Sequence, residues 1–245
     1  MSKAALVFSA KGGVGKSIFT VALLSSLSKL KKRILIVDAD LYNGGITTLL
    51  NLKPKKTIYD FSKEDPTSKF LNINNYVTKY NDYISVVCAP KNILEADDVN
   101  VTSLKDLISH SYLLYDCILV DTNHIYNKFN TSLIKSVDEV LYLITNDPLD
   151  LENSKNILDE LKKSKKKVSI ILNNSIKINK DYFSKYDIKS IIRNNIDYTL
   201  SNKFYLDNID SLIAKEKLLT KLELKAGDVP AFNLIAKILT AEEKK

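Results

Sequence analysis

One short segment combines glycines, two lysines and a serine, which are residue types that bind phosphate. It reads Ser9-Ala10-Lys11-Gly12-Gly13-Val14-Gly15-Lys16-Ser17, and it follows a predicted strand and opens a predicted helix. This is the setting that a phosphate-binding P-loop requires. Glycines let backbone N–H groups turn toward phosphate oxygens, and a helix N-terminus favours negative charge. We therefore predict that Lys16 reaches the β- and γ-phosphates of a nucleotide and that the Ser17 hydroxyl ligates Mg²⁺.

Two apolar strands that end in carboxylates supply the second group of candidate residues. Ile34–Val37 leads into Asp38 and Asp40, and Ile118–Val120 leads into Asp121. Open α/β sheets bind ligands at the carboxyl edge of their strands, so we expect Asp121 to lie beside the P-loop.

The elements that position these residues alternate between strand and helix. Predicted strands span Ala4–Ser9, Arg33–Asp38, Tyr83–Cys88, Cys117–Asp121, Val140–Thr145, Val168–Asn173 and Ile188–Ile192. Helical patterns span Lys16–Leu30, Ile46–Leu50, Thr102–Leu113, Phe129–Ser136, Leu151–Lys163 and Val229–Thr240. Several strands are almost continuous in Val, Ile and Leu, as expected when both faces are covered. The sequence predicts an α/β fold, a mostly parallel twisted sheet with helices on both faces.

Composition restricts the class of protein further. The 245 residues include 36 Lys and Arg against 29 Asp and Glu, a formal net charge of +7. A hydrophobic fraction of 45% excludes a largely disordered chain. There is no apolar run of membrane-helix length and no signal-peptide pattern, so we expect a cytoplasmic protein. Cys88 and Cys117 are expected to be buried thiols, and the irregular segment Lys53–Asn81 is expected to form short helices and loops.

The heptapeptide Lys-Gly-Gly-Val-Gly-Lys-Ser at positions 11–17 resembles the deviant Walker A motif of ParA/MinD P-loop ATPases. The resemblance covers nearly the whole chain and implies one ATPase domain, 1–245. It implies that ATP and Mg²⁺ are bound and that an ATP-dependent homodimer forms. Lys11 would reach the nucleotide of the partner subunit, with catalytic roles for Lys11, Lys16 and Asp40. Nucleotide contacts would come from Gly12, Gly13, Val14, Gly15, Lys16, Ser17 and Ile18.

The same resemblance assigns roles to the acidic residues. Asp38 would hold an Mg²⁺-bound water, Asp40 would orient the attacking water, and Asp121 would be the Walker B carboxylate. Asn173 ends another strand and would read the adenine edge, with Asn174 as a competitor. Asn123 stands where relatives often carry Pro, and we expect His124 to be a loop residue.

Motif order is most similar to the TadZ/CpaE pilus-assembly subgroup. The matching stretches are Asp40–Gly45, Val87–Pro90, Asp116–His124 and Leu143–Pro148. This implies an ATPase switch that positions a pilus or secretion apparatus and is recruited to a pole, the nucleoid or a membrane-associated complex. Its protein partner would come from a pilus, secretion or partition system.

Four alternatives stay open at this stage. A ParA-type partition ATPase would use the lysine-rich run Lys162–Lys167 for nonspecific DNA contacts; a helix end with solvated lysines is the preferred interpretation. A MinD-type membrane ATPase would need a basic amphipathic tail, whereas Val229–Thr240 is expected to pack on the core. A bacterial tyrosine kinase is disfavoured because no C-terminal tyrosine cluster is present. A nucleotide-binding scaffold with negligible hydrolysis is the fourth.

Overall fold

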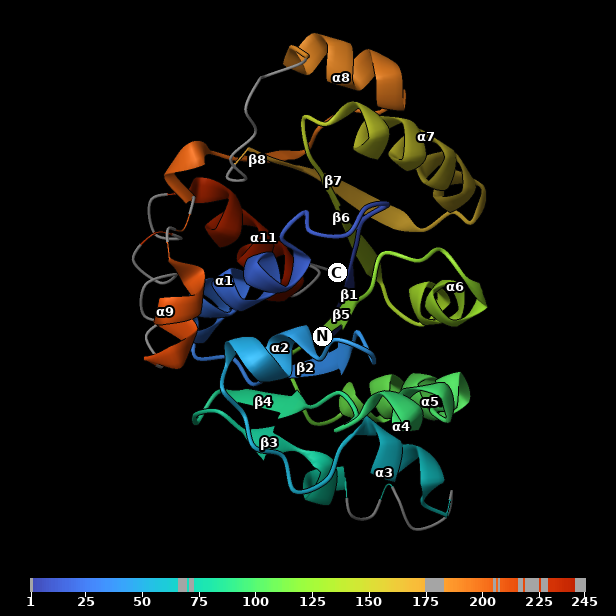
Figure 1. The fold of residues 1–245 in the computed structure, drawn as a ribbon, viewed down its shortest axis with the longest axis vertical. Helices are drawn as coiled ribbons and strands as arrows, with labels where there is room; N and C mark the ends of the chain where they lie inside the picture. The colour runs from blue at the N-terminus through green and yellow to red at the C-terminus, as the bar shows by residue number, and fades with distance from the viewer. Residues whose placement is uncertain are drawn as a thin grey trace, which may run out of the picture.

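A computed structural model describes residues 2–65, 70, 73–174, 183–204, 206, 208–215, 218, 225 and 229–240. Within them, an eight-stranded sheet has the order β3-β4-β2-β5-β1-β6-β7-β8 (Figure 1). Neighbouring strands are parallel except β3 and β4. The strands are β1 (Lys3–Phe8), β2 (Ile34–Ala39), β3 (Thr78–Lys79), β4 (Ile84–Val87), β5 (Cys117–Thr122), β6 (Glu139–Ile144), β7 (Lys167–Asn173) and β8 (Tyr198–Leu200).

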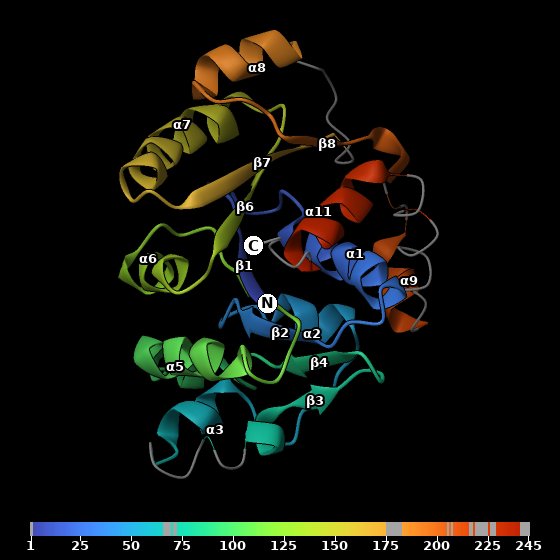
Figure 2. The ribbon, with the colours of Figure 1, turned by 180° about the vertical axis from the view of Figure 1, so that it is seen from behind.

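Helices cover both faces of this sheet, and each face has its own apolar core. One core includes side chains of α1 (Lys16–Lys29), α2 (Gly45–Leu49) and α11 (Pro230–Thr240), with α9 (Ile209–Ala214) packed against it. The other includes side chains of α3 (Ile58–Lys63), α4 (Ile93–Asp97), α5 (Val101–Ser111), α6 (Lys128–Lys135), α7 (Pro148–Lys163) and α8 (Lys185–Ile192). Figures 1 and 2 show α1 and α11 on the opposite side of the sheet from α5, α6 and α7. The predicted α/β fold is therefore confirmed.

The near-continuous apolar runs explain why the central strands form where they do. All six residues of β2 and all six of β5 are buried, as required of strands covered on both faces. Cys88 and Cys117 are buried free thiols, as expected. The Lys53–Asn81 segment contains α3, β3 and a 3₁₀ helix at Ile73–Tyr76, and its residues 66–69 and 71–72 lie outside the described ranges.

The predicted strand at Ile188–Ile192 is wrong. These residues form the second half of α8, whose start is fixed by a capping box between Ser184 and Asp187. The helix buries Ile188 and Ile192, which are four residues apart and therefore on one face. A short apolar run does not separate a buried helix from a strand by its pattern alone, and here the capping residues decide the outcome.

The final helix, α11, packs on the core as predicted. Its buried Phe232 ring lies 5.5 Å from the ring of Phe19 in α1 and 4.9 Å from that of Phe204. Lys3 Nζ also donates to the carbonyl of Ile238, 3.2 Å away. The apolar face of this helix is thus used inside the fold, which removes the basis for a MinD-like membrane tail at Val229–Thr240.

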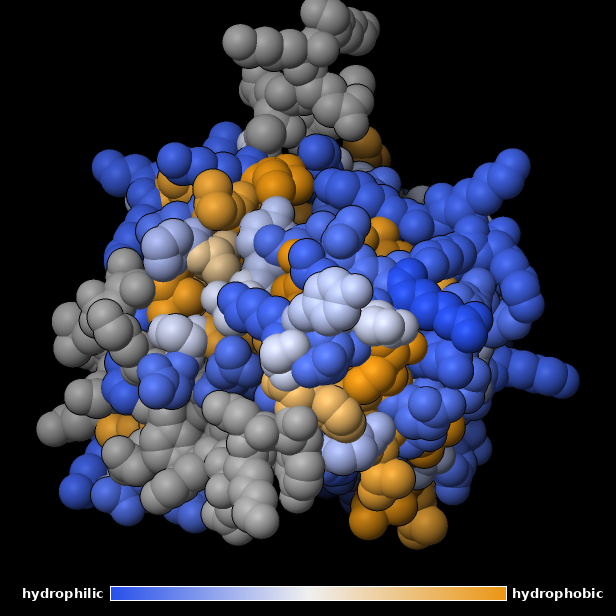
Figure 3. Space-filling view, turned by 90° about the horizontal axis from the view of Figure 1, so that it is seen from above, coloured by the Kyte–Doolittle hydropathy of each residue, from blue (hydrophilic) through white to orange (hydrophobic). Residues whose placement is uncertain are grey.

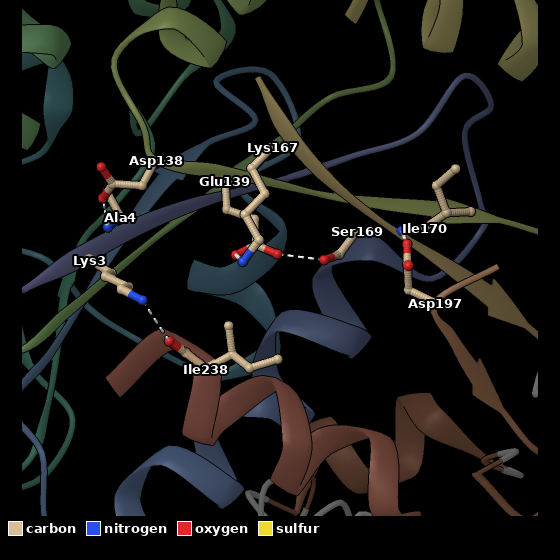
Figure 4. A network of polar contacts seen from close by, with 9 residues as sticks. All are labelled: Lys3, Ala4, Asp138, Glu139, Lys167, Ser169, Ile170, Asp197 and Ile238. Carbon is tan, nitrogen blue, oxygen red and sulfur yellow. Dashed lines mark hydrogen bonds and ion pairs between the residues drawn. The ribbon is translucent and has the colours of Figure 1, made fainter. Parts of the chain in front are cut away.

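Polar contacts at the amino edge of the sheet fix the register of its second half (Figure 4). Buried Glu139 accepts from Lys167 and from the Ser169 hydroxyl, and so joins β6 to β7. Two carboxylates just before strands, Asp138 and Asp197, accept from the backbone N–H groups of neighbouring strands. This polar edge lies opposite the edge that carries the P-loop.

The α8 end of the molecule presents mostly hydrophilic side chains with separate apolar groups among them (Figure 3). Among the described residues, no helix combines the length and the apolar character needed to cross a bilayer.

We expect Phe232→Ala to destabilise the protein by about 3–5 kcal/mol, because it removes an aromatic ring from the core between α1 and α11. Urea unfolding measures the change. The matched control is Leu234→Ala on the same helix, where the side chain is 52% exposed and the change is expected to stay within about 0.5 kcal/mol. Equal effects of the two substitutions would contradict the core position of α11.

Candidate nucleotide site

The P-loop lies between β1 and α1, as predicted. Gly13 and Gly15 have φ values of 76° and 90°, a backbone region that glycine enters without the steric cost of a Cβ. Gly15 is the N-cap residue of α1, and no side chain caps this helix end. Its free backbone N–H groups therefore form a ready anion site.

Lys16 is buried at the base of this loop. Its side chain is held back by a 3.1 Å hydrogen bond from Nζ to the Ser9 hydroxyl, which in turn donates to the Lys11 carbonyl. Burial lowers the pKa of Lys16, and the negative charges of Asp121, Asp40 and Asp150 oppose that shift. The amine thus sits in a low-dielectric site where a phosphate charge would be strongly attracted.

Asp38 and Asp121 are direct neighbours across β2 and β5 and are both fully buried. Burial raises the pKa of Asp38 to about 7 and that of Asp121 to about 6. The nearby charge of Asp121 adds to the shift at Asp38, whereas hydrogen bonds from Ser17 and Thr20 and the charge of Lys16 limit the shift at Asp121. Two buried carboxylates of like charge are the arrangement that a cation relieves.

Ser17 is drawn onto the second of these carboxylates. Its Oγ donates to Asp121 Oδ2 over 2.6 Å, and Thr20 Oγ1 donates to the other oxygen over 3.1 Å. Gly45 at the start of α2 covers the same hydroxyl, since a Cβ there would lie 2.6 Å from Ser17 Oγ. The residue predicted to ligate Mg²⁺ is therefore in contact with one predicted acidic partner.

The side chains around Ser17 fit Mg²⁺. Asp38 accepts from the Thr47 backbone N–H and hydroxyl with one oxygen, while its other oxygen is buried without a partner. No group of three or more His, Cys, Asp or Glu forms a metal centre within the described residues. The carboxylates of Asp38 and Asp121 beside the Ser17 hydroxyl suit Mg²⁺, which binds through one or two carboxylates and completes its shell with phosphates and water.

The remaining sequence-predicted residues lie around this centre. Asp40 accepts with both oxygens from Asn43 Nδ2 at 3.0 Å, in the loop that follows β2. Buried Asn173 donates its amide N–H to the Val14 carbonyl at 2.9 Å, so it supports the P-loop from β7. His124 lies in a loop, and a Cβ on Gly12 would come within 3.4 Å of its ring.

Lys11 turns away from the loop toward α7. Its Nζ lies 3.0 Å from Asp147 Oδ2, and both side chains are partly exposed. Asp147 is also the N-cap residue of α7, where its side chain accepts from the Asp150 N–H. Backbone hydrogen bonding and Lys11 lower the pKa of Asp147.

Sequence reasoning missed three groups that act at this site. Asp147 carries a visible signal, because Asp followed by Pro148 is a typical helix start. Thr20 lies one helical turn beyond Lys16, so its position beside Asp121 follows once α1 is placed. Thr47 had no comparable signal, since only the fold of the 40–47 segment brings it to Asp38.

Comparisons with known proteins find similar sequences and similar structures. Residues 1–80 match a ParA family model described as "NUBPL iron-transfer P-loop NTPase". An uncharacterized ATP-binding protein of Methanocaldococcus jannaschii, MJ0924, is 26% identical over 90% of both chains. The match to a second protein of that organism, MJ0169, covers 57% of this chain and 51% of that protein at 22% identity.

Solved structures resemble nearly the whole chain. A ParA family ATPase from Chlorobium tepidum has a TM-score of 0.80 at 17% identity, over 96% of this chain and 99% of its own. The septum site-determining protein MinD from Pyrococcus horikoshii, complexed with Mg-ADP, has a TM-score of 0.78 at 17% identity, over 98% and 97%. At these identities the likeness establishes the fold.

We expect Asp38→Asn to stabilise the metal-free, nucleotide-free protein, because it removes a buried charge beside Asp121. The folded pKa of about 7 lies above the ordinary value of 3.8. The contribution of this carboxyl to the free energy of unfolding is therefore fully present below pH 3.8, where the group is protonated. It is lost as the pH rises to about 7. At pH 8 the variant should melt several degrees higher, where about 1 kcal/mol corresponds to about 2–4 °C.

Calorimetry in EDTA between pH 5 and pH 8 measures this difference, which should shrink as the pH falls. Asp82→Asn, at an exposed position between β3 and β4, changes the same charge outside the site and should not reproduce the pH dependence. A variant that melts lower than the natural protein at pH 8 would show that the Asp38 charge is compensated in the fold.

Proposed function

We propose that residues 1–245 form one ATPase domain of ParA/MinD type, a Mg-ATP-dependent dimerising switch that positions a cellular assembly. The observation that carries the proposal is the convergence of Lys16, Ser17, Asp38 and Asp121 on one end of the P-loop. The buried partnerless oxygen of Asp38 and the uncapped N-terminus of α1 add an acceptor for a cation and donors for an anion. Together they favour a metal–triphosphate ligand.

In this proposal each residue has a separate task. The loop from Gly12 to Ile18 holds the phosphates, and Lys16 leaves Ser9 to contact the β- and γ-phosphates. Mg²⁺, when bound, would neutralise phosphate charge, with Ser17, Asp38 and Asp121 as the residues that hold it or its waters. Asp40 orients the water that attacks the γ-phosphorus, and ADP and phosphate leave. Asn173 contributes to the adenine side while it supports Val14.

Lys11 acts between subunits. Its amine is not needed by its own P-loop, and in the single chain it is paired with Asp147 at a partly exposed position. Exchange of this carboxylate for the partner's nucleotide would join two subunits through ATP, and the added positive charge would stabilise the charge that develops during hydrolysis. Slow, partner-stimulated turnover follows from a site completed only in the dimer.

The assembly that the switch positions is a pilus or secretion apparatus. The motifs shared with the TadZ/CpaE subgroup support this choice. Electron microscopy of surface filaments, in cells with and without the gene, tests this pilus or secretion role. A MinD-like positioning ATPase remains the second candidate, supported by the likeness to MinD structures; one solved relative is a MinC:MinD complex from Aquifex aeolicus.

The lysine-rich run Lys162–Lys167 gives little support to a DNA-partitioning role. Lys162 and Lys166 donate to backbone carbonyl groups, and Lys163 and Lys167 pair with Glu160 and Glu139. Four of the five lysines in that run thus have partners inside the fold, as expected for a helix end and the strand after it.

Lys16→Ala should abolish binding of a fluorescent ATP analogue without unfolding the protein, because the lost amine is a phosphate ligand with little role in packing. Titration with and without Mg²⁺ measures the affinity, and circular dichroism checks the fold. Lys29→Ala, an exposed lysine at the other end of α1, is the matched control. Unchanged affinity in a folded Lys16→Ala protein would exclude this P-loop as the nucleotide site.

Asp40→Ala should retain Mg-ATP, hydrolyse it at least about tenfold more slowly in single-turnover assays, and accumulate as a dimer. In that background Lys11→Ala should keep nucleotide affinity and lose the dimer. Light scattering with Mg-ATP measures the mass. The same mass with and without Lys11 would rule out the proposed contact between subunits. Negligible hydrolysis by the natural protein with DNA, lipid and candidate partners would favour the scaffold alternative.

A further inference from the structure

The imidazole of His124 stands against the P-loop. His124 lies in the loop that follows β5, and a Cβ on Gly12 would lie 3.4 Å from its Nδ1 and 3.5 Å from its Cε1. Both Gly12 and His124 are exposed, so the ring stands at the open side of the phosphate-binding loop. The tasks proposed for Lys16 and Ser17 do not involve this ring.

Short contacts hold the backbone on both sides of His124 in place. Thr122, the last residue of β5, donates its hydroxyl to a carbonyl of β1 at 2.8 Å, which ties the start of the loop to the strand that leads into the P-loop. The Asn123 side chain accepts from the Ile125 N–H at 2.9 Å and from the amide of buried Asn130 at 2.7 Å. The turn that carries the ring is therefore already formed in the nucleotide-free chain, which reduces the cost of ordering it on binding.

The ring nitrogens of His124 are available to a ligand. In the part of the chain that the structure describes, neither nitrogen makes a hydrogen bond or an ion pair. The other histidine is different, because His110 Nδ1 lies 2.9 Å from the Asp106 carbonyl and its ring stacks on Phe70. An imidazole offers one N–H donor when neutral and two when charged, so His124 can donate to an anion beside Gly12.

The order of the strands places His124 on the γ-phosphate side of the proposed nucleotide site. The strands run β2-β5-β1-β6-β7, and the P-loop follows β1 (Figure 1). The proposed adenine contact, Asn173, ends β7, whereas Asp40, proposed to orient the attacking water, follows β2. His124 follows β5, between β2 and the P-loop, and it lies three residues beyond Asp121, which accepts from Ser17. A ring in this position meets the end of a triphosphate and not the base.

Lys11 does not compete for this place in the single chain. It precedes Gly12, but its Nζ pairs with Asp147 at 3.0 Å, at the start of α7 and on the β6 side of the P-loop. His124 approaches the same glycine from the β5 side. A phosphate bound beside Gly12 would therefore meet the imidazole within its own subunit, whereas Lys11 is proposed to act on the partner's nucleotide.

We propose that His124 donates a hydrogen bond to the γ-phosphate of ATP, so that the loop after β5 distinguishes ATP from ADP. The inference rests on the proposed nucleotide site, to which it adds a residue. ADP lacks the phosphate that the ring would reach, so the contact exists in one nucleotide state only. A difference of this kind is what a nucleotide-dependent switch requires, because a ligand shifts an equilibrium only through differential interactions. A ring that merely covers Gly12 would affect both nucleotides equally.

The first test compares affinities for Mg-ADP and for Mg-AMPPNP, a non-hydrolysable ATP analogue, by competition against a fluorescent nucleotide. The Lys11→Ala background removes the proposed dimer. In it, His124→Ala should weaken AMPPNP binding about tenfold and ADP binding less than about twofold, since a hydrogen bond to a charged group is lost in one case only. His124→Gln keeps a side-chain N–H and should restore most of the AMPPNP affinity. Ile125→Ala, an exposed neighbour in the same loop, should change neither affinity.

Proton NMR in the same background provides a second measurement, because the sequence contains only two histidines. The Cε1–H resonance of His124, assigned by its loss in His124→Gln, should shift with Mg-AMPPNP and much less with Mg-ADP. His110 lies in the last turn of α5, and its resonance should stay in place with both nucleotides.

Three outcomes would overturn the proposal. They are an equal or larger loss of ADP affinity in His124→Ala, unchanged affinity for both nucleotides, and a His124 resonance that responds alike to the two. Failure of the proposed function differs from all of these, because the natural protein would then bind neither nucleotide. Normal binding of both nucleotides by His124→Ala contradicts only the role of His124.

Discussion

The buried pair of Asp38 and Asp121 is the constraint on which the rest of the site depends. Parallel pairing of β2 with β5 places the two carboxylates side by side under α1 and α2, where burial raises the pKa of each. Hydroxyl groups of Ser17, Thr20 and Thr47 and the amine of Lys16 offset part of this cost. The fold thus maintains an electrostatically unfavourable centre, which a cation bound there would relieve.

Helix α2 packs closely against this pair of carboxylates. Gly45 lets the helix come against Ser17 because no Cβ occupies the space beside the hydroxyl, and Thr47 fastens the same helix to Asp38. The loop before α2 carries Asp40, which accepts from Asn43, and Tyr42, whose hydroxyl donates to Asp97 of α4. One short segment thus connects the buried carboxylate pair to α4.

The excess of positive charge has two different uses in the fold. In the 162–167 run, lysines donate to backbone carbonyl groups and pair with carboxylates at the ends of helices and strands, so they contribute to the architecture. Around Pro54 and Lys91 the lysines are exposed beside apolar side chains. Net charge alone does not distinguish these cases, because the difference lies in what each ammonium group contacts.

The sequence by itself determined the P-loop, the carboxylates at the strand ends and the α/β fold, because glycine spacing and continuous apolar runs act within a few neighbouring residues. It did not determine whether Ile188–Ile192 forms a helix or a strand, because either element can bury these apolar residues. The cap at Ser184 favours the helix. The contacts of Ser17 with Asp121, Lys11 with Asp147 and Thr47 with Asp38 were decided by the tertiary structure. Ser17 and Asp121 are 104 positions apart, and only the order and register of parallel strands bring such residues within hydrogen-bonding distance.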